Sequence, residues 1–188
     1  MKKILFLIFI FVACKDKLPI IQDMPNNYQF LSSDSTEVIF PNEFKGKIIV
    51  LGLIFTNCPD ICPLTTNNMR LIQEEVKKRD LDNVEFVAIS FDPKHDTPEV
   101  LRNYIRIRDF DTSNWKFLTG NQSEIDKLLE DIGFFAIPSD TIKTVKGEMV
   151  TFIHTDRISL IDSNLKIRKN YPGSTINIEE IINDIQNL

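Results

Sequence analysis

The hydrophobic pattern of the chain first predicts two strands that are buried on both faces of a sheet. Ile48–Phe55 (IIVLGLIF) is an unbroken apolar run, and Val84–Phe91 (VEFVAISF) is a second stretch of the same character. Apolar runs of this kind are typical of central strands in a sheet that is covered on both sides. Shorter strand patterns are found at residues 28–31, 36–40, 115–118, 158–162 and 165–169.

Apolar residues at helical spacing predict four helices between and after these strands. Pro63 suits the first turn of the first helix, and Asp96-Thr97-Pro98-Glu99 marks the start of the second. Asn121 with Glu124 resembles a capping box for the third helix. The expected apolar positions are Leu64, Leu71, Ile72 and Val76; Val100, Leu101, Tyr104 and Ile105; Ile125, Leu128, Leu129 and Ile132; and Ile178, Ile181, Ile182 and Ile185.

The order of these elements predicts an α/β domain. A β-hairpin with its turn at residues 32–35 comes first, and is followed by βαβα, a strand, a helix, a second hairpin around Ser163-Asn164 and a closing helix. Such an order produces a mixed sheet with helices on both faces. This is the plan of a thioredoxin-like domain to which an N-terminal β-hairpin has been added.

The first residues of the chain have the pattern of a lipoprotein signal peptide. Lys2 and Lys3 precede the apolar run Ile4–Ala13, which is too short to span a bilayer and suits the core of a signal sequence. Ala13 followed by Cys14 then resembles a bacterial lipoprotein processing site. We therefore expect residues 1–13 to be removed and Cys14 to become the lipidated N-terminus. The alternative is ordinary signal cleavage, with Cys14 incidental.

A lipid anchor of this kind implies a protein held on a membrane outside the cytoplasm, in the bacterial periplasm or at the cell surface. Residues 14–27 contain Pro19, Pro25 and polar residues without sustained periodicity. We interpret this segment as a lipid-anchored tether. The folded domain is then expected to span residues 28–188.

The length and the charge of the chain limit the number of its domains and the kinds of partner that it can bind. The 188 residues allow one domain with a substantial core, but are too few for two ordinary domains. Lys and Arg number 22 against 27 Asp and Glu, which makes the net charge −5 at pH 7. Because no basic cluster is large enough to follow a phosphate backbone, a nucleic acid is not expected as a partner.

Two of the three cysteines lie where the first buried strand turns into a helix, in Cys58-Pro59-Asp60-Ile61-Cys62-Pro63. Sulfur atoms four residues apart at a helix start can project from one face, close enough to bind one ion or to form a redox disulfide. The helix N-terminus also stabilises the thiolate form. A thioredoxin-type redox motif has two intervening residues, whereas this one has three, which favours metal binding. A disulfide that only staples the loop is the structural alternative.

Only two histidines are available as additional ligands. His95 lies in a polar loop ahead of a helix and is interpreted as solvated. His154 comes directly before the second hairpin, and in a thioredoxin-like fold the loop at that place faces the cysteine turn. Soft thiolates select Cu(I), and an added imidazole can also hold Cu(II). Cys58, Cys62 and His154 are therefore the predicted ligands of a copper ion.

Four segments of the chain carry a family resemblance, which runs from about Tyr28 to the C-terminus: GLIFTNCPDICP, ISFDPKHDTPEVLRNYIR, WKFLTGN and FIHTDRISLID. They are similar to the Sco/SenC family of copper-binding cytochrome oxidase assembly proteins. The resemblance implies a thioredoxin-like copper-binding domain over residues 28–188, with the ligands named above. It also implies a partner, the cytochrome c oxidase subunit that carries the dinuclear copper centre, which the protein would help to metallate.

Two parts of the chain depart from the family pattern. Asp156-Arg157 places charge where members are commonly more apolar after the histidine, and residues 134–151 align poorly. The aspartates of DPKHDTPEV can have a functional or a structural role. In a functional role they would line the site entrance or contact a basic partner. We favour the structural role, a turn and a helix cap in which Asp96 or Thr97 accepts backbone N–H bonds.

Two classes of function follow from these residues. The leading hypothesis is a copper chaperone, a binding protein and not an enzyme in the usual sense. The alternative is a thiol–disulfide oxidoreductase that reduces cysteines of a copper-site partner, with His154 handling protons. A peroxidase-like thiol enzyme is a third and weaker possibility, because the sequence shows no dedicated activating site for a peroxidatic thiol.

Overall fold

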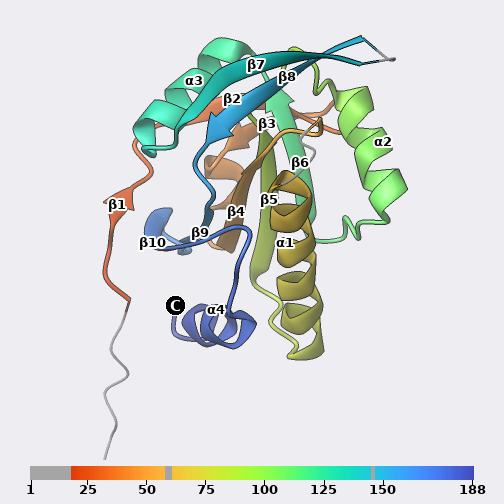
Figure 1. Cartoon of the computed structure of the whole chain (residues 1–188). Coiled ribbons are helices and arrows are strands. Elements are labelled where there is room, and N and C mark those ends of the chain that lie inside the picture. Colours follow the sequence, from red (N-terminus) through yellow and green to blue (C-terminus); the bar gives the residue numbers. More distant parts are fainter. Residues whose placement is uncertain (1–17, 58–60, 145–146) are drawn as a thin grey trace, which may run out of the picture.

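A mixed eight-stranded sheet forms the centre of the protein (Figure 1). The computed structural model describes residues 18–57, 61–144 and 147–188. The strand order in this sheet is β1 (Gln22–Asp23), β10 (Lys166–Tyr171), β9 (Ile158–Ile161), β4 (Ile48–Ile54), β5 (Val84–Ser90), β6 (Trp115–Gly120), β2 (Tyr28–Ser32) and β3 (Glu37–Phe40). β4, β5 and β6 are parallel, whereas β9 and β2 join them antiparallel on either side. The predicted mixed sheet is therefore confirmed.

The central strand β4 is buried along its whole length, as its apolar run predicts. Gly52 in this strand allows a close approach of the following helix, because a Cβ atom at this position would lie 2.5 Å from the sulfur of Met69. The helix that begins after β4 therefore packs directly on the strand that leads to the cysteine turn.

In the described part of the chain four helices flank the sheet, as predicted: α1 (Ile61–Lys78), α2 (Pro98–Arg108), α3 (Gln122–Asp131) and α4 (Ile178–Ile185), with a short 3-10 helix at Asn42–Phe44. The apolar stripe of α1 differs from the expected one at Leu64 and at Met69. Leu64 is 46% exposed, whereas Met69 is fully buried. The reason is helical spacing: Met69, Ile72 and Val76 lie three or four residues apart on the face toward β4, and Leu64 falls outside that face.

Helix capping is confirmed for α2 and wrong for α3. The Thr97 side chain accepts a hydrogen bond from the Val100 N–H at 3.4 Å, so Thr97 is the cap of α2. Asn121 occupies the cap position of α3 but makes no side-chain cap bond. The Glu124 carboxylate instead accepts the Gln29 N–H of β2 at 2.9 Å. The predicted capping box fails because a strand N–H takes the carboxylate that would have closed it.

The N-terminal hairpin of β2 and β3 is confirmed and extends the main sheet, because β2 pairs with β6. At the opposite edge β1 pairs with β10. Because of this pairing the folded part of the chain begins before Tyr28, within residues 14–27, which the sequence predicts to be a tether.

Residues 134–151, which align poorly with the family pattern, contain most of a hairpin that the hydrophobic pattern does not predict. β7 (Ala136–Thr144) and β8 (Gly147–His154) form a separate two-stranded sheet. His154 is the last residue of β8, opposite Ala136. The residue is therefore held by a strand pair, whereas the sequence predicted a loop.

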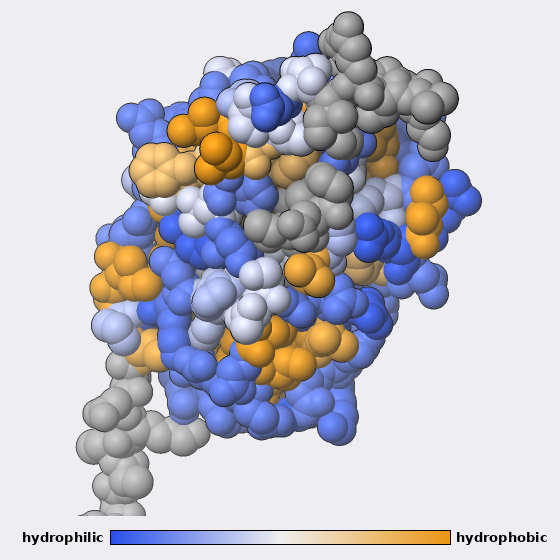
Figure 2. All heavy atoms as spheres, in the orientation of Figure 1, coloured by the Kyte–Doolittle hydropathy of each residue, from blue (hydrophilic) through white to orange (hydrophobic). Residues whose placement is uncertain are grey.

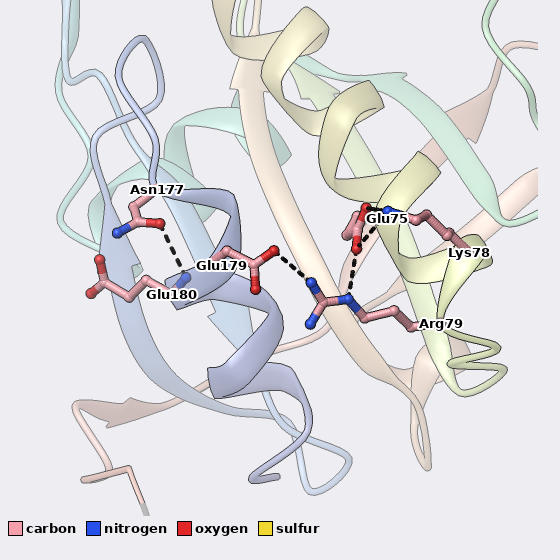
Figure 3. Close-up of polar contacts among 6 residues, drawn as sticks. All are labelled: Glu75, Lys78, Arg79, Asn177, Glu179 and Glu180. Carbon is pink, nitrogen blue, oxygen red and sulfur yellow. Dashed lines mark hydrogen bonds and ion pairs between the residues drawn. The ribbon is translucent and has the colours of Figure 1, made fainter.

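Helices α1 and α4 pack against each other and are joined by charged side chains (Figure 3). The guanidinium of Arg79, the residue directly after α1, donates to Glu179 of α4 at 2.6 Å and to Glu75 of α1 at 2.7 Å. The Asn177 side chain caps α4 by accepting the Glu180 N–H. These contacts fix the C-terminal part of the helix whose first turn contains Cys62.

Candidate metal centre

Two of the three predicted ligands, Cys62 and His154, belong to elements that are described, α1 and β8. Cys62 is the second residue of α1, and the structure describes its backbone and not its side chain. His154 is fully described. Cys58 and Cys14 lie outside the described residues. Among the described residues no three His, Cys, Asp or Glu side chains converge to hold a metal ion.

The imidazole of His154 lies in a cluster of phenylalanine rings. Its centroid is 5.2 Å from that of Phe91, 5.9 Å from that of Phe55 and 6.4 Å from that of Phe134. Phe55 follows β4 directly and precedes Cys58 by three residues, while Phe91 follows β5. These ring contacts bring His154 to the strand that leads into the cysteine turn. Such apolar surroundings strengthen electrostatic interactions because the local dielectric constant is low.

The hydrogen bond of His154 selects its tautomer. Nδ1 lies 3.0 Å from the backbone oxygen of Thr155. Because a carbonyl oxygen can only accept, Nδ1 carries the proton and donates it, and the neutral ring then has its lone pair on Nε2. A backbone carbonyl on the other ring nitrogen is the usual outer-shell partner of a metal-binding histidine. The donor atom of His154 is therefore of the type that copper accepts.

Asp96 connects the DPKHD loop to the start of the cysteine turn. This fully buried carboxylate accepts the Thr56 N–H at 2.9 Å, the Thr56 hydroxyl, and the Ser90 hydroxyl at 2.6 Å. Its burial raises the pKa of Asp96 above the usual value for a carboxyl group, although these hydrogen bonds oppose the shift. Asp96 therefore positions the loop two residues before Cys58, a role that differs from the favoured helix cap and from the two functional roles considered for these aspartates.

His95 is more than the solvated residue that the sequence suggests. Its ring is half-buried, and Nδ1 lies 2.7 Å from the Asp92 carboxylate, which is itself buried. Both residues line a cavity between this loop and the β7–β8 hairpin, together with Phe91 and Phe152. Asp92 and His95 thus form a separate pair beside the aromatic cluster.

The two charged residues that depart from the family pattern both anchor the loop after His154. Asp156 accepts two hydrogen bonds from Ser174, from the N–H at 3.0 Å and from the hydroxyl at 2.6 Å. Arg157 donates to the Ile132 carbonyl at 2.9 Å, near the end of α3, and its guanidinium lies over the Phe134 ring. Burial lowers the pKa of Arg157. Charge at these positions therefore points inward.

The outer face of the β7–β8 hairpin carries an exposed apolar patch. Phe135, Ile137 and Ile153 are 70%, 58% and 71% exposed, and the two isoleucines lie opposite each other on the paired strands. Figure 2 shows apolar side chains gathered at the end of this hairpin that adjoins α3. His154 follows Ile153 and belongs to the opposite face of β8. An apolar patch next to a candidate site is typical of a surface that contacts another protein.

Solved structures of three proteins resemble this fold over nearly all of its length. A SCO1/SenC family lipoprotein from Bacillus anthracis str. Ames has a TM-score of 0.78 and is 34% identical, covering 92% of this chain and 99% of its own. BsSco, a member of the Sco family of cytochrome c oxidase assembly proteins with a disulfide switch, has a TM-score of 0.74, 27% identity and coverages of 92% and 97%. ScoI from Bradyrhizobium japonicum, with copper bound, has a TM-score of 0.71, 27% identity and coverages of 86% and 96%.

The likeness extends to a family model. The model described as SCO1/SenC matches residues 19–188, which is the whole chain apart from its first 18 residues. The match includes the cysteine turn, the aromatic cluster and His154. It confirms the resemblance that the four sequence segments indicated, and the chain belongs to the SCO1/SenC family.

Proposed function

We propose that this protein binds one copper ion through Cys58, Cys62 and His154 and passes it, as cargo, to the dinuclear copper centre of a cytochrome c oxidase subunit. The observation that supports this most directly is the state of His154, whose Nδ1 donates to the Thr155 carbonyl at 3.0 Å. Its lone pair is then on Nε2. The copper-bound relative and the oxidase-assembly relative support the cargo and the recipient. The exposed apolar patch supports a protein partner near the site.

The roles of the chain's own residues follow from their places in the fold. Cys62 lies in the first turn of α1, where the helix dipole favours a thiolate. The two cysteines would supply soft sulfur donors, and His154 a borderline nitrogen donor that also suits Cu(II). The aromatic rings around His154 restrict its movement and exclude water from one side of the site. Copper would gain a three-coordinate site from which a partner can remove it.

X-ray absorption of the Cu(I)-loaded protein tests this proposal. One copper per chain is expected, with scattering from two sulfur atoms and one nitrogen atom. His154→Ala should remove the nitrogen contribution and weaken Cu(II) binding strongly, while leaving the two sulfur ligands to Cu(I). His95→Ala is the matched control, since it removes the other histidine of the chain. Sulfur scattering alone in the wild-type protein, or unchanged Cu(II) affinity in His154→Ala, would remove His154 from the site.

A second function, thiol–disulfide exchange with a copper-site partner, is supported by the disulfide switch of BsSco. It uses the same two cysteines and needs no metal ligand from His154. The two functions are separated by His154→Ala: an oxidoreductase would retain thiol exchange with its partner, whereas a chaperone would lose Cu(II) binding with its thiols still reactive.

We also propose that the mature protein is a lipoprotein, with residues 1–13 removed, Cys14 lipidated and the domain held outside the cytoplasm by a tether that begins at Cys14 and ends before β1. The Bacillus anthracis relative is a lipoprotein, which supports this arrangement. In the described part of the chain no helix is both long and apolar enough to cross a membrane.

The anchor can be tested by detergent-phase partition. The mature wild-type protein is expected in the detergent phase, because two or three acyl chains on Cys14 would bury enough apolar surface for stable membrane attachment. Cys14→Ser should move the protein to the aqueous phase. Mass spectrometry of the N-terminus is the check, since a soluble mature protein beginning at another residue would contradict the lipoprotein assignment.

A further inference from the structure

We propose that the turn Gly173-Ser174, between β10 and α4, braces the copper site by tying the helix of Cys62 to the strand end of His154. The brace consists of Asn68, Gly173, Ser174 and Asp156. Its members are positioning residues, because none of them is a proposed ligand. The proposal rests on the copper-binding function put forward above.

On one side the brace is attached to α1. The Asn68 side chain donates to the Gly173 carbonyl at 2.8 Å. Gly173 is buried, and a Cβ atom at this position would lie 2.9 Å from the Thr65 hydroxyl. Thr65 follows Cys62 by three residues, which is nearly one helical turn. The backbone of the turn therefore lies directly against the α1 surface next to the cysteine.

On the other side the brace is attached to the residue that follows His154 by two positions. The Ser174 N–H and hydroxyl both donate to Oδ2 of Asp156, at 3.0 and 2.6 Å. The missing Cβ of Gly173 would lie only 2.4 Å from Oδ1 of the same carboxylate. Asp156, Gly173 and Thr65 are thus packed so closely that a methyl group at Gly173 would have to displace at least one of them.

Asp156 also destabilises the fold in a way that an exposed turn residue would not. Its Oδ1 is buried and has no hydrogen-bond partner in the described part of the chain. A buried acceptor without a partner destabilises the fold. The other oxygen, Oδ2, nevertheless accepts both hydrogen bonds from Ser174. This arrangement indicates that the position of Asp156, and with it the backbone after His154, is held at the expense of stability.

The brace should affect copper binding because the proposed ligands Cys62 and His154 must be kept at a fixed distance from each other. Cys62 and His154 belong to elements that are far apart in the sequence, and the four residues of the brace join these elements. Changing a residue that orients a metal ligand typically lowers metal affinity by about 10- to 100-fold. Loss of the brace should have an effect of this size without removing any ligand.

The test compares copper affinity and the Cu(II) electron paramagnetic resonance spectrum among four variants. Asp156→Ala and Gly173→Ala should each weaken Cu(II) binding by about 10- to 100-fold in competition with a chelator, and should broaden or shift the spectrum. Asp156→Asn should stay close to wild type, because an amide oxygen can accept both Ser174 donors. Asp34→Ala is the matched control, since Asp34 also accepts an N–H and a hydroxyl, from Thr36, in the β2–β3 turn.

Three outcomes would overturn the brace: unchanged affinity and spectrum in Asp156→Ala, an equal loss in Asp156→Asn, or an equal loss in Asp34→Ala. An equal loss in the asparagine variant would mean that the negative charge acts on copper directly. Circular dichroism and thermal unfolding show whether Gly173→Ala still folds, and Asp156→Ala decides the question if it does not. Failure of the wild-type protein to bind one copper would contradict the proposed function instead, so the two failures are distinguishable.

Discussion

Oxidation of the Cys58–Cys62 pair is expected to abolish Cu(I) binding. Disulfide formation removes two protons and two electrons from the thiols and takes away two of the three proposed ligands. His154 is left as a single imidazole, which cannot hold Cu(I) against the soft ligands of a competitor. Copper and disulfide are then mutually exclusive states of one sulfur pair. The apo protein would need a reductant before loading, while bound copper should shield the thiols from oxidants.

The measurement is a pair of anaerobic Cu(I) titrations, one on the oxidised protein without reductant and one after reduction. Thiol counting before each titration establishes which state is present. A variant with both residues changed, Cys58→Ser and Cys62→Ser, is the control and should resemble the oxidised protein in both titrations. Equal affinity in the oxidised and reduced wild-type protein would place the metal somewhere other than on these two sulfurs.

Replacement of Asp96 by alanine is expected to lower the free energy of unfolding by about 2–4 kcal/mol. The variant leaves three donors without their acceptor: the Thr56 N–H, the Thr56 hydroxyl and the Ser90 hydroxyl. Relief of the buried carboxylate offsets part of this loss. Such a loss is a large fraction of the net stability of an ordinary domain, which is about 5–15 kcal/mol. Urea denaturation followed by circular dichroism measures it.

The same variant should also weaken copper binding, because Thr56 lies two residues before Cys58. Asp162→Ala is the matched control. Asp162 is likewise buried and accepts three hydrogen bonds, from Asn164, Lys166 and Arg168. It lies at the opposite end of the sheet, since β9 starts beside Gly52 and ends beside Ile49. Both variants should lose stability, and only Asp96→Ala should lose copper affinity. Equal copper affinity in the two would contradict a positioning role for Asp96.

Much of the architecture could be predicted because its signals are local. The unbroken apolar run of β4 becomes a fully buried strand, and helical spacing marks α2, α3 and α4 at nearly their observed bounds. The hairpins at both ends of the domain follow from short polar turns between apolar segments. Each of these patterns is a spacing of residue types that can be recognised within a short stretch of sequence.

The elements that were missed or misassigned depend on partners far away in the chain. The β7–β8 hairpin has little apolar alternation to mark it, because one face packs on the domain while Ile137 and Ile153 on the other remain exposed. Glu124 has the spacing of a capping residue, yet its carboxylate bonds to Gln29, 95 positions away. No local rule can anticipate a donor brought in by the sheet.

The same division holds for the candidate site. Copper could be predicted because the chemistry of its proposed ligands can be recognised from the sequence alone. These ligands are two thiols at a helix start and a histidine before a hairpin. Asp96 and Asp156 are ordinary aspartates in that view. Their importance depends on Thr56, 40 positions from Asp96, and on Ser174, 18 positions from Asp156. Ligand chemistry belongs to individual side chains, whereas the support that orients ligands comes from hydrogen bonds between segments that meet only after folding.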